Sequence, residues 1–145
     1  DDGAAALIIA DEEAIKKNNL TPIAKIICAA SSGVDPSYMG IGPVTASQKV
    51  LKKSNLSIDN IDVLEINEAF ASHVLACLRE FGVSDNDERV NPNGGAIALG
   101  HPLGMSGARL VLTAAKELEI TNKKYALCTM CVGVGQGSAI ILEKV

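Results

Sequence analysis

One of the two histidines in this chain lies in its most glycine-rich segment. Between Asn91 and Arg109 the sequence reads NPNGGAIALGHPLGMSGAR, which places five glycines and two prolines around His101. A backbone so free of side-chain bulk can approach a ligand closely, and histidine is the side chain whose unperturbed pKa lies nearest to neutral pH. The segment therefore predicts acid–base chemistry at His101. The alternative is a loop histidine that only satisfies backbone carbonyls.

A cysteine followed by glycines is the second candidate. The sequence CVGVGQG runs from Cys131 to Gly137, and glycines there expose backbone N–H groups that can hold an anionic oxygen. Cys131 is therefore a candidate nucleophile or proton shuttle, with an inert buried strand cysteine as the alternative. Cys128 completes a C-x-x-C pattern, but residues three apart on a strand point to opposite faces. No second pair with ligand spacing exists, so we expect no metal site.

Asn67 is the third candidate because it directly follows an apolar strand pattern over 61–66. Its alternative role is structural, since asparagine can cap the next helix with Glu68 in the first turn. Ligands of open α/β sheets bind beyond the carboxyl ends of the strands. If the strands are parallel, we expect Asn67, His101 and Cys131 to gather at one edge of the sheet.

The elements that would position these residues alternate between strands and helices. Apolar runs predict strands over 4–10, 24–30, 61–66, 125–132 and 138–142, and helical patterns cover 11–18, 43–55, 68–81 and 106–118. This alternation predicts one α/β domain over residues 1–145, with a mixed, mostly parallel five-stranded sheet and helices on both faces. The short turn over 133–137 makes the last strand antiparallel.

Composition excludes several classes of partner. The net charge is −4 and the basic residues are scattered, which argues against nucleic acid. No apolar run is long enough to span a membrane. The four cysteines do not resemble a disulfide framework, which favours a reducing, cytoplasmic setting. The apolar run begins almost at once after Asp1, so we expect a segment of a longer protein.

Three segments together resemble the C-terminal signatures of the thiolase family, in the family's order. They are NEAFA from Asn67, the glycine-rich block over 91–109 and CVGVGQG from Cys131. The glycine-rich block is the most specific of them. DGAAAL over 2–7 and MGIGPV over 39–44 are also similar to thiolase sequence. The resemblance covers essentially the whole chain, but only the second half of a thiolase.

The resemblance implies a thiolase-like C-terminal domain that takes part in acyl transfer to or from coenzyme A, as in fatty acid metabolism. The substrate would be a coenzyme A thioester, and no covalently bound cofactor is expected. By resemblance, His101 would activate a nucleophilic cysteine and then donate to the thioester oxygen, and Asn67 would hold a water that completes this oxyanion hole. Cys131 would be the acid/base at the substrate alpha carbon, and the Gly133 N–H would line a second oxyanion hole.

The chain departs from the family pattern in one important respect. The family's nucleophilic cysteine belongs to the N-terminal half, and none of Cys28, Cys77 and Cys128 has its sequence context. The resemblance therefore implies an N-terminal thiolase domain as partner, a homo-oligomer for the full-length protein and no activity for this chain alone. A non-catalytic thiolase-like interaction domain is the alternative. Val134 also stands where many members have glycine.

Overall fold

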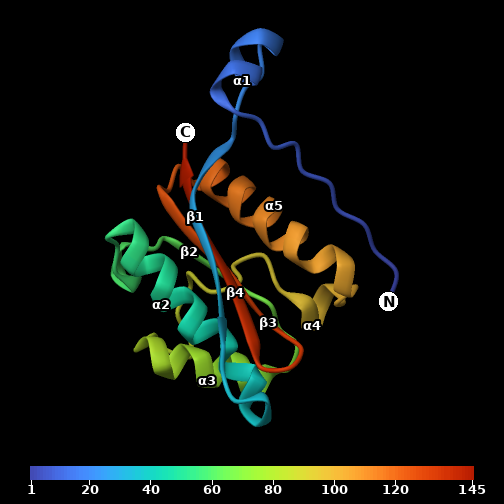
Figure 1. The fold of residues 1–145 in the computed structure, drawn as a ribbon, viewed down its shortest axis with the longest axis vertical. Coiled ribbons are helices and arrows are strands. Elements are labelled where there is room, and N and C mark those ends of the chain that lie inside the picture. The colour runs from blue at the N-terminus through green and yellow to red at the C-terminus, as the bar shows by residue number, and fades with distance from the viewer.

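One mixed sheet lies at the centre of the structure, a computed structural model that describes residues 1–145 (Figure 1). Its strands are β1 (Ala24–Gly33), β2 (Val63–Ile66), β3 (Tyr125–Val132) and β4 (Gln136–Lys144). Its α-helices are α1 (Glu12–Asn18), α2 (Gly42–Ser54), α3 (Ala71–Phe81), α4 (Ala96–Leu99) and α5 (Leu103–Thr121), and the 3-10 helices are η1 (Pro36–Ile41) and η2 (Ile58–Asn60). None of the helices is long and apolar enough to cross a membrane.

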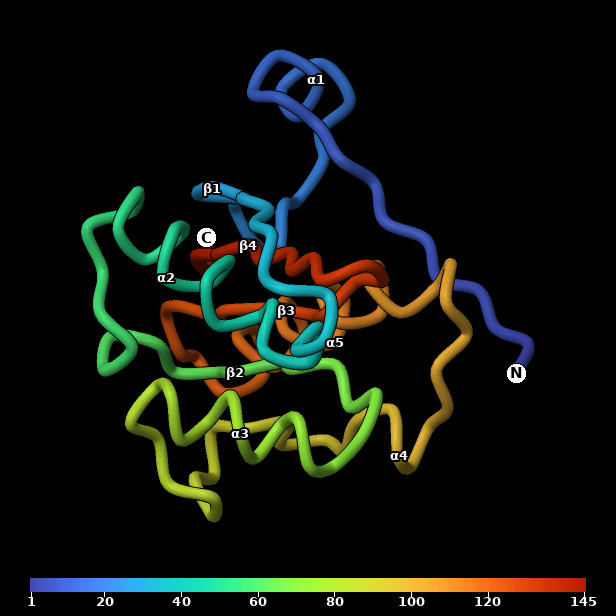
Figure 2. Tube along the Cα trace, turned by 60° about the horizontal axis from the view of Figure 1, so that its bottom comes forward, coloured from blue at the N-terminus to red at the C-terminus, as the bar shows by residue number.

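The sheet has four strands in the order β1-β4-β3-β2, which Figure 2 shows stacked from one edge to the other. Strand β2 pairs in parallel with β3, whereas β4 lies between β1 and β3 and is antiparallel to both. Strands β1, β2 and β3 therefore run in one direction and β4 runs against them. This arrangement confirms the mixed sheet with an antiparallel last strand.

The expected fifth strand over 4–10 is wrong. This segment has no regular secondary structure, and Ile8 and Ile9 are 88% and 70% exposed. A run of apolar residues becomes a strand only where a neighbour accepts its backbone hydrogen bonds. Here the segment passes along the α5 side of the molecule (Figure 1), and just before it a Cβ on Gly3 would overlap Pro102. Strand β1 is therefore the first strand of the sheet.

Two apolar layers hold the helices to the sheet, one on each face. Alternate strand residues point to opposite faces, and Leu64 of β2 accordingly packs in one layer while Val63 packs in the other. Helices α2 and α3 cover the first face, and α5 covers the second (Figure 1). The carboxyl ends of β2 and β3 lie between these layers, so both faces contribute to what surrounds them.

A close backbone contact fixes the hairpin between β3 and β4. Gly137 pairs with Cys131, and a Cβ on Gly137 would overlap the carbonyl oxygen of Gly42, the first residue of α2. Only glycine allows α2 to begin so near to the strand. At the hairpin tip Val134 has a φ of 65°, a left-handed conformation that is strained for a β-branched residue. The hairpin thus holds Gly133 just beyond Cys131.

Candidate active site

Asn67 lies one residue beyond β2 and is fully buried. Its backbone N–H donates to the Thr129 carbonyl at 3.0 Å and so extends the ladder with β3. Helix α3 begins only at Ala71, with Phe70 as its N-cap, so Asn67 does not have the alternative role of capping this helix. The Asn67 side chain instead donates from Nδ2 to Nε2 of His101 at 3.2 Å.

A short hydrogen-bond relay orients the imidazole of His101. An amide nitrogen only donates, so Nε2 of His101 accepts from Asn67 and carries no proton. The neutral ring then has its proton on Nδ1, which donates to Ser106 Oγ at 2.6 Å. The buried Ser106 hydroxyl donates in turn to the Pro102 carbonyl at 3.1 Å. The relay fixes both the ring orientation and the tautomer that leaves a basic nitrogen at Nε2.

Two polar side chains tie the glycine-rich loop to β2. The Asn91 side chain accepts from the Ile66 N–H at 2.8 Å and donates to the Ile66 carbonyl at 2.9 Å. It thus bonds both backbone groups of Ile66, as a neighbouring strand would do. The Glu68 carboxylate accepts from Asn91 Nδ2 at 2.9 Å and from the Ile97 N–H at 3.0 Å. A Cβ on Gly95 would overlap this carboxylate. A side chain at position 95 would therefore have to displace the Glu68 carboxylate from these hydrogen bonds.

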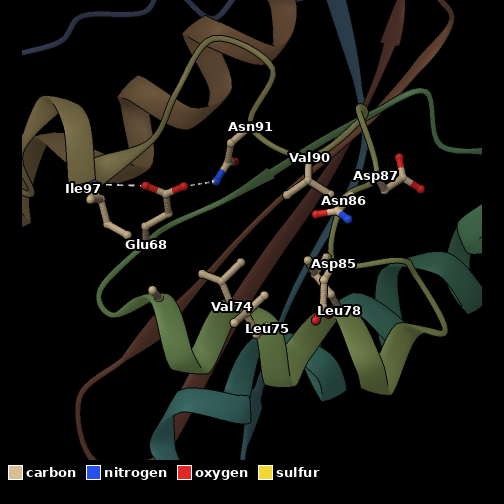
Figure 3. A pocket seen from close by; sticks show the side chains of 11 residues that line it. Glu68, Val74, Leu75, Leu78, Asp85, Asn86, Asp87, Val90, Asn91 and Ile97 are labelled. Carbon is tan, nitrogen blue, oxygen red and sulfur yellow. Dashed lines mark hydrogen bonds between the residues drawn. The ribbon is translucent and has the colours of Figure 1, made fainter.

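The same carboxylate borders a pocket between α3 and the segment over 85–91 (Figure 3). The acidic groups of this pocket are already paired, since Asp85 binds Arg79 at 2.9 Å and Asp87 binds Arg89 at 2.8 Å. None of the predicted site residues lines it. We therefore do not treat this pocket as the candidate site. The candidate site lies at the ends of β2 and β3.

Cys131 lies at the end of β3, next to the strand that carries Asn67. Its side chain is 6% exposed. Because strand residues alternate, Cys131 shares the face of Leu127, which is covered by α2 and α3. No hydrogen bond joins its Sγ to Asn67 or His101. The structure thus brings Asn67 and His101 into contact and places Cys131 at the neighbouring strand end, on the opposite face of the sheet from Asn67.

Hydrogen bonding separates Cys131 from the other cysteines. The thiols of Cys28, Cys77 and Cys128 donate to the backbone carbonyls of Val50, Gly40 and Leu110. Cys131 has no such partner. Burial raises the pKa of every one of these thiols, to about 12 for Cys77. All four are therefore protonated at neutral pH, and Cys131 is the one whose proton is not engaged by the fold.

The backbone of Gly133 is free to bind a ligand. Gly133 lies in the exposed hairpin turn, and its N–H donates to no backbone carbonyl. Its carbonyl, which belongs to the next peptide of the turn, accepts from Gln136 Nε2 at 3.0 Å. No group of three or more His, Cys, Asp or Glu side chains gathers anywhere in the chain in a way that could hold a metal ion.

Sequence reasoning missed three residues that the structure adds around the site. The bond from His101 to Ser106 was not predicted, because His101 lies before α5 begins. A hydroxyl side chain one turn into that helix could have indicated it. Glu65 and Arg109 form an ion pair at 3.1 Å across 44 positions of sequence. A charged residue inside the apolar strand VLEI was the signal for a buried partner.

The fold and the motifs define the class of protein. The family model for "Thiolase, C-terminal domain" matches residues 20–144. The chain therefore belongs to the thiolase family, and its α/β fold is that of the family's C-terminal domain.

Particular relatives extend this assignment. The β-ketoadipyl-CoA thiolase of Pseudomonas aeruginosa is 62% identical over 144 residues, which are 99% of this chain and 36% of that protein. The acetyl-CoA acetyltransferase of Syntrophomonas wolfei is 49% identical over 142 residues, again 36% of its length. Human mitochondrial 3-ketoacyl-CoA thiolase superposes with a TM-score of 0.90 at 48% identity, over 94% of this chain and 34% of that one. The chain thus spans about a third of the curated relatives it matches.

Proposed function

We propose that this chain is the C-terminal catalytic part of a thiolase, an acetyl-CoA C-acyltransferase that cleaves or forms 3-ketoacyl-CoA through an acyl-cysteine. The relay from Asn67 through His101 to Ser106 carries the proposal, because it presents an unprotonated Nε2 in a fixed orientation. A positioned base of this kind is what activates a cysteine nucleophile. Because Nε2 has one lone pair, the Asn67 N–H must give way when Nε2 takes the thiol proton. The new N–H of the imidazolium then donates to the thioester oxygen.

Asn67 has a second role in this proposal. Its Oδ1 is buried without a protein partner, while its Nδ2 is committed to His101. A buried polar atom of this kind is normally satisfied by water. Such a water beside the protonated imidazole would complete an oxyanion hole, as the resemblance implies. The free N–H of Gly133 would stabilise oxyanion charge at the second site.

Cys131 supplies the proton in the cleavage direction. The nucleophilic thiolate adds to the keto carbon of the substrate, the bond from this carbon to the alpha carbon breaks, and acetyl-CoA leaves as an enolate. The Cys131 thiol gives its proton to the alpha carbon. Free coenzyme A then takes the acyl group from the nucleophile, and its thiol returns a proton to Cys131. The raised pKa of Cys131 favours the protonated form that this step requires.

The nucleophile itself is assigned to the N-terminal thiolase domain. None of the four thiols here has the lowered pKa that marks an activated cysteine. The substrate is a coenzyme A thioester, with no covalently bound cofactor. A homo-oligomeric assembly and a cytoplasmic location stay predictions. The names of the similar proteins suggest β-ketoadipyl-CoA beside acetoacetyl-CoA as test substrates.

A non-catalytic interaction domain is the second candidate function, because several apolar side chains near the site are exposed to solvent. Phe70, Ile97, Leu99 and Leu103 are all more than 60% exposed, and exposed apolar surface of this kind marks interfaces. In the first proposal these side chains meet the rest of the thiolase.

Thiolysis assays decide between the two candidates. The full-length protein is expected to cleave acetoacetyl-CoA or β-ketoadipyl-CoA in the presence of coenzyme A, followed as loss of the thioester enolate absorbance. Purified residues 1–145 are expected to cleave neither. A full-length protein inactive on the whole panel would favour the interaction domain, and activity of the isolated chain would overturn the assignment of the nucleophile.

A further inference from the structure

A second polar link between β2 and α5 lies beside the relay. Oε2 of Glu65 accepts from Nη1 of Arg109 at 3.1 Å, with the two side chains 0% and 12% exposed. Glu65 precedes Asn67 by two residues, so both side chains leave the same face of β2. Arg109 follows Ser106 by three residues and therefore lies on the same side of α5.

These two links form successive rungs between strand and helix. From Glu65 to Asn67 the strand rises by about 6.6 Å, and from Arg109 back to Ser106 the helix rises by about 4.5 Å. The two links therefore follow one another at similar spacings along β2 and α5. The lower rung joins Glu65 to Arg109, and the upper rung joins Asn67 through His101 to Ser106. A slide of α5 along β2 would break both rungs together. The lower rung therefore constrains where the upper rung can form.

The lower rung is a poor source of stability. Burial raises the pKa of Glu65 to about 7 in spite of Arg109, with smaller raising effects from Glu68 and Glu117. Cys128 is the other titratable group at this carboxylate. The pKa of Glu65 is higher in the folded than in the unfolded protein, so its protonated form favours folding. This contribution to the free energy of unfolding is complete below the ordinary carboxyl pKa and is lost as the pH rises through about 7. Buried ion pairs are often replaceable by apolar residues without loss of stability.

Oε1 of Glu65 and Nη2 of Arg109 also lack protein partners although both are buried. One acceptor and one donor thus remain beside the bonded pair. The fold retains two ionisable groups in its interior without satisfying all of their polar atoms. The role of the pair must then lie in geometry rather than in energy.

We infer that Glu65 and Arg109 are positioning residues, whose pairing sets the height of α5 along β2 so that Asn67 meets His101. The catalytic consequence rests on the proposed function, but the positioning itself does not. Misplacement of a reacting group by about 1 Å can cost on the order of 10²-fold in rate. The pair acts through Asn67 and His101 and does not touch the substrate.

Two variants of the full-length protein test the inference. Glu65→Leu with Arg109→Met fills the space without a directional link, whereas Glu65→Gln alone is isosteric and keeps an acceptor for the hydrogen bond from Arg109. Melting temperature, kcat, KM and a crystal structure are measured for each variant. For the apolar pair we expect an unchanged or higher melting temperature, an unchanged KM and a kcat lower by about 10²-fold. The amide variant Glu65→Gln should keep kcat within about threefold of the parent.

The crystal structures provide a result that is independent of activity. The inference expects the 3.2 Å contact between Asn67 Nδ2 and His101 Nε2 to be lost in the apolar variant and kept in the amide variant. Retention of that contact in the apolar variant overturns the inference, even if the parent protein has no thiolase activity. Parallel losses of kcat and melting temperature in both variants overturn it as well. Failure of the parent to cleave any substrate overturns only the proposed function.

Discussion

Replacing Cys131 with alanine in the full-length protein is expected to lower kcat for thiolysis by about 10²- to 10⁴-fold, the range lost with a positioned general acid. The reason is that the departing enolate loses its proton donor. The side chain is small, so folding should survive. Steady-state thiolysis of acetoacetyl-CoA measures the loss, and exchange of the acetyl-CoA methyl protons with deuterated water reports the same proton transfer without turnover.

Cys28→Ala is the matched control for this variant. Cys28 lies on β1 and its thiol donates to the Val50 carbonyl, away from the strand ends that carry the site. Its loss should leave kcat within about threefold, because it removes one weak hydrogen bond. A Cys131→Ala enzyme that keeps more than a tenth of parental turnover would remove Cys131 from the mechanism.

Replacing His101 with alanine is expected to lower kcat/KM by about 10³-fold, because a positioned base contributes roughly 10²- to 10⁴-fold. The nucleophilic cysteine should then react more slowly with iodoacetamide, since its thiolate fraction falls. Added imidazole should restore part of the activity by occupying the space left by the ring. This rescue separates a missing base from a damaged fold.

His73→Gln is the matched control for the second histidine. The Nδ1 of His73 accepts from the Phe70 N–H at the start of α3, and burial lowers its pKa. Glutamine at this position of a helix can make the same capping bond. Turnover close to that of the parent is expected. Unchanged iodoacetamide reactivity of His101→Ala would mean that another group activates the nucleophile.

Local patterns predicted most of the fold. The apolar run over 125–132 forms β3, and the helical pattern over 43–55 forms α2 with its ends shifted by one residue. Both predictions succeeded because the apolar side chains of each segment are buried in the core. The run over 4–10 failed for the opposite reason, since no strand of this chain pairs with it. Composition can predict that a segment is apolar, but only tertiary contacts decide what covers it.

The residues of the candidate site could be named from the sequence, but the hydrogen bonds between them could not. Motifs indicated Asn67, His101 and Cys131, and parallel β2 and β3 brought the first and last to neighbouring strand ends. The direct contact from Asn67 to His101 depends on where α5 lies, which no local pattern encodes. For the same reason the links to Ser106 and between Glu65 and Arg109 emerged only from the structure.

The central claim is that this chain holds the acid–base half of an acyl-transfer site whose nucleophile lies outside residues 1–145. Mass spectrometric mapping of the acyl group tests it most directly. The full-length protein is incubated with acetyl-CoA, quenched in acid and digested. The account predicts one acetylated cysteine in a peptide that precedes Asp1, with Cys131 unmodified. Acetylation of Cys131, or of any other cysteine within these residues, would contradict it.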